Sequence, residues 1–350
     1  MAKTKYIEKL SYSKTNVMEN CPYKYKIQYI DKHFVYSDTL ATLIGGLIHL
    51  IEEQIGEALK DGVIPDYDKL KKDLYEINIP KTTPTDPDGG IFGVNILKEK
   101  YRDEYYSVNE NGESYHTLIQ KYAESGIYRL QNFLTKFPDW TVFAVEQYFE
   151  VDYYCQPTGK HYTLHGYIDR ILKNTKTGEF MIEDLKTRSK LVPDEDLKSP
   201  MQFFFYSYAL KSMQRLFDYP EHCRYDLVLM DERQAGGTKG WIGRCQKKLD
   251  KILIDIEQKA FVPNPSPLCY YCAFSGTNPD RHNLDPKDRH LCPYYSLWTK
   301  GGTAKVWEVE NKWEGFDKHD VILARYKAEQ TSDTNGHIDI DLDAEFDFDY

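Results

Sequence analysis

The stretch from residue 162 to 190 constrains the fold of this chain more than any other part of the sequence. β-Branched and aromatic residues in 164–171 predict a strand, and Asn174 and Gly178 predict a turn. A second strand is then predicted for 179–185. Together these segments predict a β-hairpin.

The arms of this hairpin carry three charged residues, Asp169, Asp184 and Lys186. Residues two apart in a strand share a face, so Asp184 and Lys186 point the same way, and pairing across the hairpin can bring Asp169 close to them. Two carboxylates and an ammonium group suit a divalent cation with a lysine that orients a water or balances charge on a phosphate. A surface ion pair is the simpler explanation for such a triplet taken alone.

The hairpin resembles the core of the PD-(D/E)XK nucleases of the RecB and AddB type, in which a G-x-I-D strand precedes a strand ending in (D/E)-x-K. The corresponding segments here are 166–169 and 184–186. Further marks of that family occur in the same order, and the resemblance spans about residues 11 to 295. These marks are Ser11, Tyr12, Ser13 with Cys21 and Pro22; Gly45, Gly46 and His49; and Gln202 with Tyr206.

The resemblance implies an α/β fold of the restriction-endonuclease type, with a mixed sheet flanked by helices, an inserted helical lobe and a C-terminal cysteine region. It implies a metal-dependent DNA nuclease, more often an exonuclease than an endonuclease, that hydrolyses phosphodiester bonds in recombination, repair or degradation. The alternative is a catalytically inactive subunit that keeps the nuclease fold and binds DNA or serves as a scaffold.

The same resemblance assigns roles to individual residues. Asp169 and Asp184 are expected to hold Mg²⁺ or Mn²⁺, with His49 completing or flanking the site, although a histidine on an apolar helix stripe is often a core residue. Lys186 is expected to position the attacking water. Gln202 and Tyr206 lie one helical turn apart and are expected to contact the DNA backbone or hold Lys186. Glu146, on the preceding strand, is a second-rank candidate that either binds metal or orients the site.

Hydrophobic periodicity predicts the remaining elements. Strands are expected at 141–154 and 224–230, and 80–93 is expected to be a turn-rich loop. Helices are expected at 41–59, 67–77, 113–136, 197–216 and 246–260. Five segments follow: 1–40 with a distal cysteine, a helical lobe 41–140, the nuclease core 141–262, a cysteine region 263–312 and an acidic tail 313–350.

Four of the seven cysteines point to a second site. Cys269 and Cys272 form a C-x-x-C, Cys292 follows, and Zn²⁺ completed by a histidine such as His282 or His290 is one interpretation. The family resemblance implies instead a [4Fe-4S] cluster held by Cys21, Cys269, Cys272 and Cys292, although the gap before Cys292 is longer than usual. Both cofactors remain candidates. The other three cysteines are predicted to be buried thiols: Cys155, Cys223 and Cys245.

The formal net charge of −10 is unusual for a DNA enzyme, but it is unevenly distributed. Residues 331–350 hold seven acids and no Lys or Arg, so the first 330 residues carry −3. This tail is expected to be disordered or to dock on a single-strand-binding, annealing or helicase protein. The sequence lacks a secretory signal and any apolar run near about eighteen residues, so we expect a cytoplasmic protein of a bacterial or phage-infected cell, without a membrane partner.

Overall fold

The computed structural model describes residues 9–33, 39–80, 90–109, 111–220, 222–264, 266, 269–270, 272–275 and 291–292. The acidic tail, His282, His290 and most of the predicted 80–93 loop lie outside these residues. The chain divides into two compact units. The sheet unit comprises 1–12, 38–154 and 161–247, and the cysteine unit comprises 13–37, 155–160 and 248–350.

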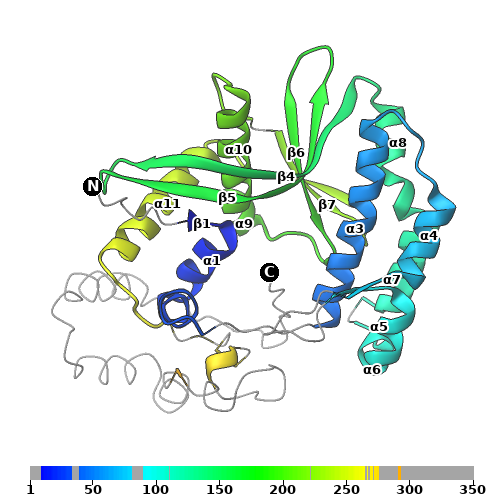
Figure 1. Cartoon of the computed structure of the whole chain (residues 1–350), viewed down its shortest axis with the longest axis horizontal. Helices are drawn as coiled ribbons and strands as arrows, with labels where there is room; N and C mark the ends of the chain where they lie inside the picture. Colours follow the sequence, from blue (N-terminus) through cyan, green and yellow to red (C-terminus); the bar gives the residue numbers. More distant parts are fainter. Residues whose placement is uncertain are drawn as a thin grey trace. The chain divides into compact units, whose positions relative to one another are not determined.

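A mixed six-stranded sheet forms the centre of the sheet unit (Figure 1). Its strands are β1 (Lys9–Leu10), β4 (Trp140–Cys155), β5 (Lys160–Asn174), β6 (Phe180–Lys186), β7 (His222–Leu227) and β8 (Glu232–Gly236). The order is β1-β5-β6-β7-β8, and β4 also pairs with β5. Strands β1 and β5 are parallel, as are β6 and β7, whereas β5–β6 and β7–β8 are antiparallel. The predicted hairpin is the β5–β6 pair, and the predicted mixed α/β fold is confirmed.

Helices gather beside the sheet in a lobe (Figure 1). The lobe contains α3 (Leu40–Lys60), α4 (Tyr67–Glu76), the two-stranded β2 (Asn78–Pro80) and β3 (Gly90–Phe92), α5 (Val94–Lys100), α6 (Arg102–Tyr106), α7 (Tyr115–Glu124), the 3₁₀ turn η2 (Gly126–Tyr128) and α8 (Arg129–Lys136). Its apolar core includes Leu172 and Leu185 of the sheet. The lobe therefore packs directly on the strands that carry the candidate site.

The long helix α3 matches its predicted span of 41–59 closely. Leu43, Leu47, Ile51 and Ile55 recur every four residues and are all buried, which gives the helix one continuous apolar stripe. A reciprocal capping box between Thr39 and its N3 residue starts the helix. The stripe fixes α3 against the lobe core and so fixes the direction of its polar face.

Two predicted helices are interrupted in the structure. The segment 113–136 breaks into α7 and α8 at Ser125–Gly126, where a side chain on Gly126 would meet the ring of Tyr122. The segment 197–216 becomes α9 (Asp194–Lys198) and α10 (Met201–Gln214), because Pro200 lacks the amide that a continuous helix requires.

Strand β7 and the last long helix also depart from their predicted bounds. The strand ends at Leu227 rather than at residue 230, because Met230 donates to the carbonyl of Leu227 in a turn that leads into β8. The helix predicted at 246–260 is α11 (Trp241–Glu257) and begins one turn earlier. Among the described residues, no helix combines the length and apolar character needed to cross a membrane.

The cysteine unit contains short helical segments. They are most of α1 (Tyr12–Asn20), α2 (Pro22–Tyr25), the π-helical turn η1 (Lys26–Ile30), the end of α11 and the 3₁₀ turn η4 (Ala273–Ser275). Pro22 opens α2, and Cys21 is its N-cap, with its sulfur accepting from the amide of Lys24. Tyr25 stacks on Phe261, with 6.0 Å between the ring centroids.

Candidate metal centre

Strand pairing brings the two aspartates of the hairpin together. The β5–β6 register pairs Arg170 with Glu183, so Asp169 and Asp184 are the next residues along the two strands. One oxygen of Asp169, Oδ2, accepts a hydrogen bond from the backbone amide of Leu185 at 2.7 Å. The carboxylate is therefore held at the end of the paired segment, where the sequence placed it.

Three side chains from three elements form a group that could hold a cation. They are His49 of α3, Glu146 of β4 and Asp169 of β5, whose candidate ligand atoms all lie within 4.8 Å of one another. His49 Nδ1 lies 3.7 Å from Glu146 Oε1. An imidazole with two carboxylates is a suitable ligand set for Mn²⁺ or another divalent ion. His49 thus belongs to the site and not to the apolar core.

Glu146 reaches this group because the backbone of β4 is irregular at that residue. Its φ of 43° lies in the left-handed region, which is uncommon for a residue with a Cβ. Before it, Val142 and Ala144 are buried, whereas beyond it the buried residues are Phe149 and Val151, so the alternation shifts by one position. A shift of this kind is typical of a β-bulge, which re-aims a side chain. From the sequence Glu146 was a second-rank candidate. The irregular backbone explains how its side chain reaches His49 and Asp169.

The charges of the group perturb each other. Burial opposes protonation of His49, but the negative charges of Asp169, Glu146 and Asp184 outweigh it and raise the pKa of the imidazole to about 9. Burial, reinforced by Glu146, also raises the pKa of Asp169, although His49, the Leu185 amide and Lys186 oppose this. Such clustered carboxylates are stabilised by a shared cation, which is how these residues fit a divalent ion.

Asp184 and Lys186 lie beside this group in a chain of polar contacts. Lys186 Nζ lies 3.2 Å from Asp184 Oδ2 and donates to Gln202 Oε1, also at 3.2 Å. Gln202 in turn donates to the hydroxyl of Tyr206 at 2.9 Å. Burial, with the charges of Asp169 and Asp184, raises the pKa of Tyr206 well above its ordinary value, so the phenol stays protonated. In this arrangement Gln202 and Tyr206 hold Lys186, and Asp184 stands outside the 4.8 Å group formed by the described residues.

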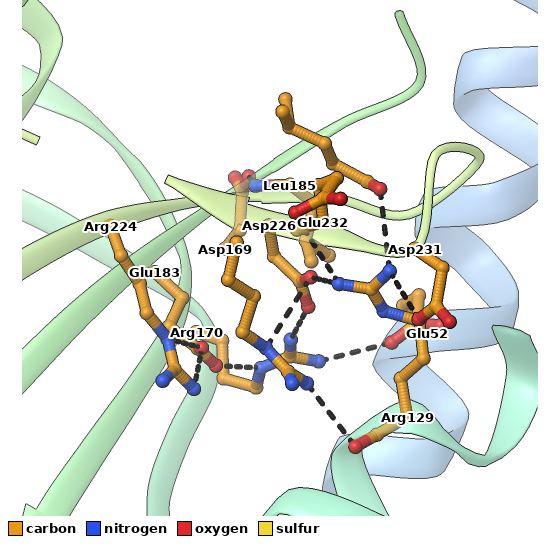
Figure 2. A network of polar contacts seen from close by, with 12 residues as sticks. Glu52, Arg129, Asp169, Arg170, Glu183, Leu185, Arg224, Asp226, Asp231 and Glu232 are labelled. Carbon is orange, nitrogen blue, oxygen red and sulfur yellow. Dashed lines mark hydrogen bonds and ion pairs between the residues drawn. The ribbon is translucent and has the colours of Figure 1, made fainter. Parts of the chain in front are cut away.

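A buried ionic network occupies the opposite side of the same strands (Figure 2). Arg170 is its centre, donating to Glu183 at 2.6 Å, to Asp226 at 2.7 Å and to Glu52 at 3.0 Å. Arg129 joins the network through an ion pair with Asp226. All five side chains are buried. Removing the central guanidinium would leave carboxylates from three elements without their shared partner.

This network is attached to the candidate site through the backbone. Arg170 directly follows Asp169, and Glu183 directly precedes Asp184. Glu52 lies one helical turn after His49 on α3. The residues of the two clusters therefore alternate along β5 and β6, and the buried cluster was not predicted from the sequence. Its signal in the sequence was a pair of charged residues, Arg170 and Glu183, directly next to the two aspartates.

The four cysteines of the predicted second site line one cavity in the cysteine unit, and Gln28 and Phe274 line it as well. Burial raises the pKa of Cys269 to about 11, and Cys21 and Cys272 add to the effect. Four thiols that line one cavity are a suitable ligand set for a metal or cluster that stabilises them as thiolates. The other three cysteines are buried, as predicted: Cys155, Cys223 and Cys245.

Comparison with known proteins gives one family. The model of the PD-(D/E)XK nuclease superfamily matches residues 9–277, which include every residue of the candidate metal centre. No curated protein matches the sequence significantly. The match covers most of the chain and agrees with the mixed sheet and with the strand positions of the two aspartates.

Proposed function

This chain belongs to the PD-(D/E)XK nuclease superfamily, and on that premise we propose that it is a Mg²⁺- or Mn²⁺-dependent deoxyribonuclease that acts as an exonuclease in DNA recombination, repair or degradation. The observation that carries the proposal is the group formed by His49, Glu146 and Asp169 within 4.8 Å. Lys186 stands beside it, 3.2 Å from Asp184. Ion-binding groups next to an oriented ammonium suit hydrolysis of a phosphodiester.

The residues divide the work between binding and positioning. His49, Glu146 and Asp169 would hold the ion, and Asp184, which lies beside them, would supply a further carboxylate. When bound, a divalent ion supplies Lewis-acid stabilisation of the charge that develops on the phosphoryl oxygens. Lys186 balances part of that charge and orients the attacking water, and Gln202 keeps its ammonium in place.

The test uses the purified full chain with end-labelled linear DNA and with circular DNA, each with Mg²⁺, with Mn²⁺ and with EDTA. We expect degradation of linear DNA that requires the ion. Lys186→Ala should lower the rate by more than about 100-fold, as loss of a charge-stabilising group does, without loss of folding. Lys198→Ala, which removes an exposed lysine paired with Glu195, is the matched control.

Three results would count against the proposal or change it. Equal rates for the parent and Lys186→Ala would remove Lys186 from the mechanism. Binding of DNA ends without release of nucleotides would favour the inactive, DNA-binding subunit. Cleavage of circular DNA at the rate of linear DNA would replace the exonuclease with an endonuclease.

We also propose that Cys21, Cys269, Cys272 and Cys292 hold a [4Fe-4S] cluster, with Zn²⁺ as the alternative. The four cysteines line one cavity. Four cysteine thiolates are the ligand set that a [4Fe-4S] cluster requires.

Metal analysis of an anaerobic preparation tests this second site. We expect iron and sulfide in the parent, loss of both in Cys21→Ser, and retention in Cys155→Ala, which removes a buried thiol of the same unit. Stoichiometric zinc without iron would support the alternative cofactor. We further propose a cytoplasmic location. We also propose that the acidic tail binds a single-strand-binding, annealing or helicase protein, and a pull-down that compares the full chain with a tail-deleted chain tests this binding.

A further inference from the structure

The outward face of the β4–β5 hairpin carries two exposed tyrosines side by side. Tyr148 of β4 and Tyr167 of β5 have 43% and 56% of their surface exposed. Their ring centroids lie 5.2 Å apart at an interplanar angle of 55°. Neighbouring Phe149 is buried, so Tyr148 belongs to the outward side of the strand. The pair presents aromatic surface to solvent where most exposed strand positions are polar.

This tyrosine pair lies close to the candidate metal centre along both strands. Tyr148 is two residues from Glu146, and Tyr167 is two residues from Asp169. Two residues of regular strand span about 7 Å, a spacing that applies to Tyr167 and Asp169 on β5, whereas β4 is irregular at Glu146. A nucleic acid chain whose phosphate lies at the metal centre would therefore bring a neighbouring base within reach of these rings.

Polar contacts hold one ring of the pair in place. The hydroxyl of Tyr148 donates to Glu150 Oε2 at 2.8 Å, and Lys9 Nζ donates to the same oxygen at 2.8 Å. Lys9 offsets the negative charge of Glu150, so the carboxylate does not present an uncompensated charge to a phosphate backbone. A ring fixed before binding loses little conformational entropy when a ligand stacks on it.

Resting on the nuclease proposed above, we propose that Tyr148 and Tyr167 form a nucleobase-binding site that gives this enzyme preference for single-stranded DNA. Exposed aromatic rings beside a backbone-binding site are the usual means of holding single strands, because every base has a face on which a ring can stack. Bases inside a duplex are already stacked and cannot reach the pair without unpairing. The substrate class is therefore an unpaired strand or a frayed end.

The first experiment measures binding of a fluorescently labelled oligothymidylate to the full chain in EDTA, so that no hydrolysis interferes. We expect Tyr148→Ala and Tyr167→Ala each to weaken binding about tenfold or more, the loss that follows from one stacked base. Tyr148→Phe and Tyr167→Phe keep the rings and should retain most of the affinity. Melting temperatures of all variants separate lost stacking from lost folding.

The chain offers a matched control on the same hairpin. Tyr154 is 51% exposed and makes a similar ring contact across the hairpin, 4.9 Å from His161, but lies eight residues from Glu146. Tyr154→Ala should bind oligothymidylate as the parent does. If all three alanine variants bind equally, Tyr148 and Tyr167 serve only to stabilise the hairpin, and the proposal is overturned.

An oligonucleotide with abasic sites gives the decisive comparison. It keeps the phosphates and lacks the bases, so Tyr167→Ala should weaken its binding far less than it weakens binding of the intact strand. An equal loss for both probes, or for blunt duplex, would show a backbone contact and overturn the proposal. The hydrolysis assay tests the nuclease separately. If the parent cleaves DNA and the tyrosine variants bind normally, only the nucleobase-binding site is overturned. If binding depends on the bases but no DNA is cleaved, only the nuclease is overturned.

Discussion

Asp169 accepts a hydrogen bond from the backbone amide of Leu185, with 2.7 Å between Oδ2 and the nitrogen. The same carboxylate belongs to the group that it forms with His49 and Glu146. One side chain therefore ties β5 to the end of β6 and supplies charge to the candidate metal centre. These two roles can be separated by substitution, because only one of them needs a negative charge.

Asp169→Asn should separate them. The amide oxygen of asparagine can still accept from Leu185, so the melting temperature should stay close to that of the parent. Without the charge, Mn²⁺ affinity measured by calorimetry should fall by more than about 100-fold, beyond the loss typical of an outer-shell residue. Asp169→Ala should bind Mn²⁺ equally weakly and should also have a lower melting temperature, because it loses the hydrogen bond from Leu185. Parent-like Mn²⁺ affinity in Asp169→Asn would remove Asp169 from the metal centre.

Substitutions at Glu146 can also separate an effect on stability from an effect on ion binding. Its positive φ is unfavourable for any residue with a Cβ and acceptable for glycine. Glu146→Ala and Glu146→Gly both remove the carboxylate, so both should bind Mn²⁺ weakly. Glu146→Gly should nevertheless be more stable than Glu146→Ala by about 1 kcal/mol in urea denaturation. A more stable alanine variant would show that the backbone relaxes and that no strain is held at this position.

The buried network predicts a large cost for losing its centre. Arg170→Met leaves Glu52, Glu183 and Asp226 without their shared guanidinium, and breaking a buried ion pair in this way costs about 3–5 kcal/mol. Lys69→Met breaks an exposed pair with Asp73 and should cost no more than about 1 kcal/mol. Denaturant unfolding of both variants measures the difference, and similar costs for the two would contradict the structural role of the network.

Glu183 should make stability depend on pH in the acid range. Burial opposes its ionisation, but Arg170, Arg224 and Arg233 outweigh burial and lower its pKa from 4.5 to about 2. Because the pKa is lower in the folded protein, the ionised carboxylate contributes stability above about pH 4.5, and this contribution is lost as the pH falls through about 2. The free energy of unfolding should decline across this window.

Two variants isolate this residue. Glu183→Gln should be less stable overall and should show a flatter decline between pH 4.5 and about 2, since no proton is taken up at that position. Glu195→Gln removes an exposed carboxylate and should keep the parental slope. An unchanged slope in Glu183→Gln, measured by urea titration at several pH values, would place the acid sensitivity elsewhere.

Much of the fold could be predicted because its signals are local. The apolar stripe of α3 and the turn at Asn174 and Gly178 each depend on a few neighbouring residues. Helix breaks were harder to predict. Pro200 ends a helix by its own chemistry, but the segment 113–136 contains no proline, and its break at Ser125–Gly126 is seen only in the structure.

The amino-acid sequence by itself determined the hairpin with Asp169, Asp184 and Lys186, because strand periodicity and turn residues act over short distances. Only the tertiary structure decided that Glu146 joins His49 and Asp169, since this depends on a left-handed residue that shifts one strand by a single position. It also decided the partners of Arg170, which come from α3, β6 and β7. Such contacts join residues far apart in the chain. Their geometry follows from the packing of whole helices and strands, which the local conformational preferences of single residues do not determine.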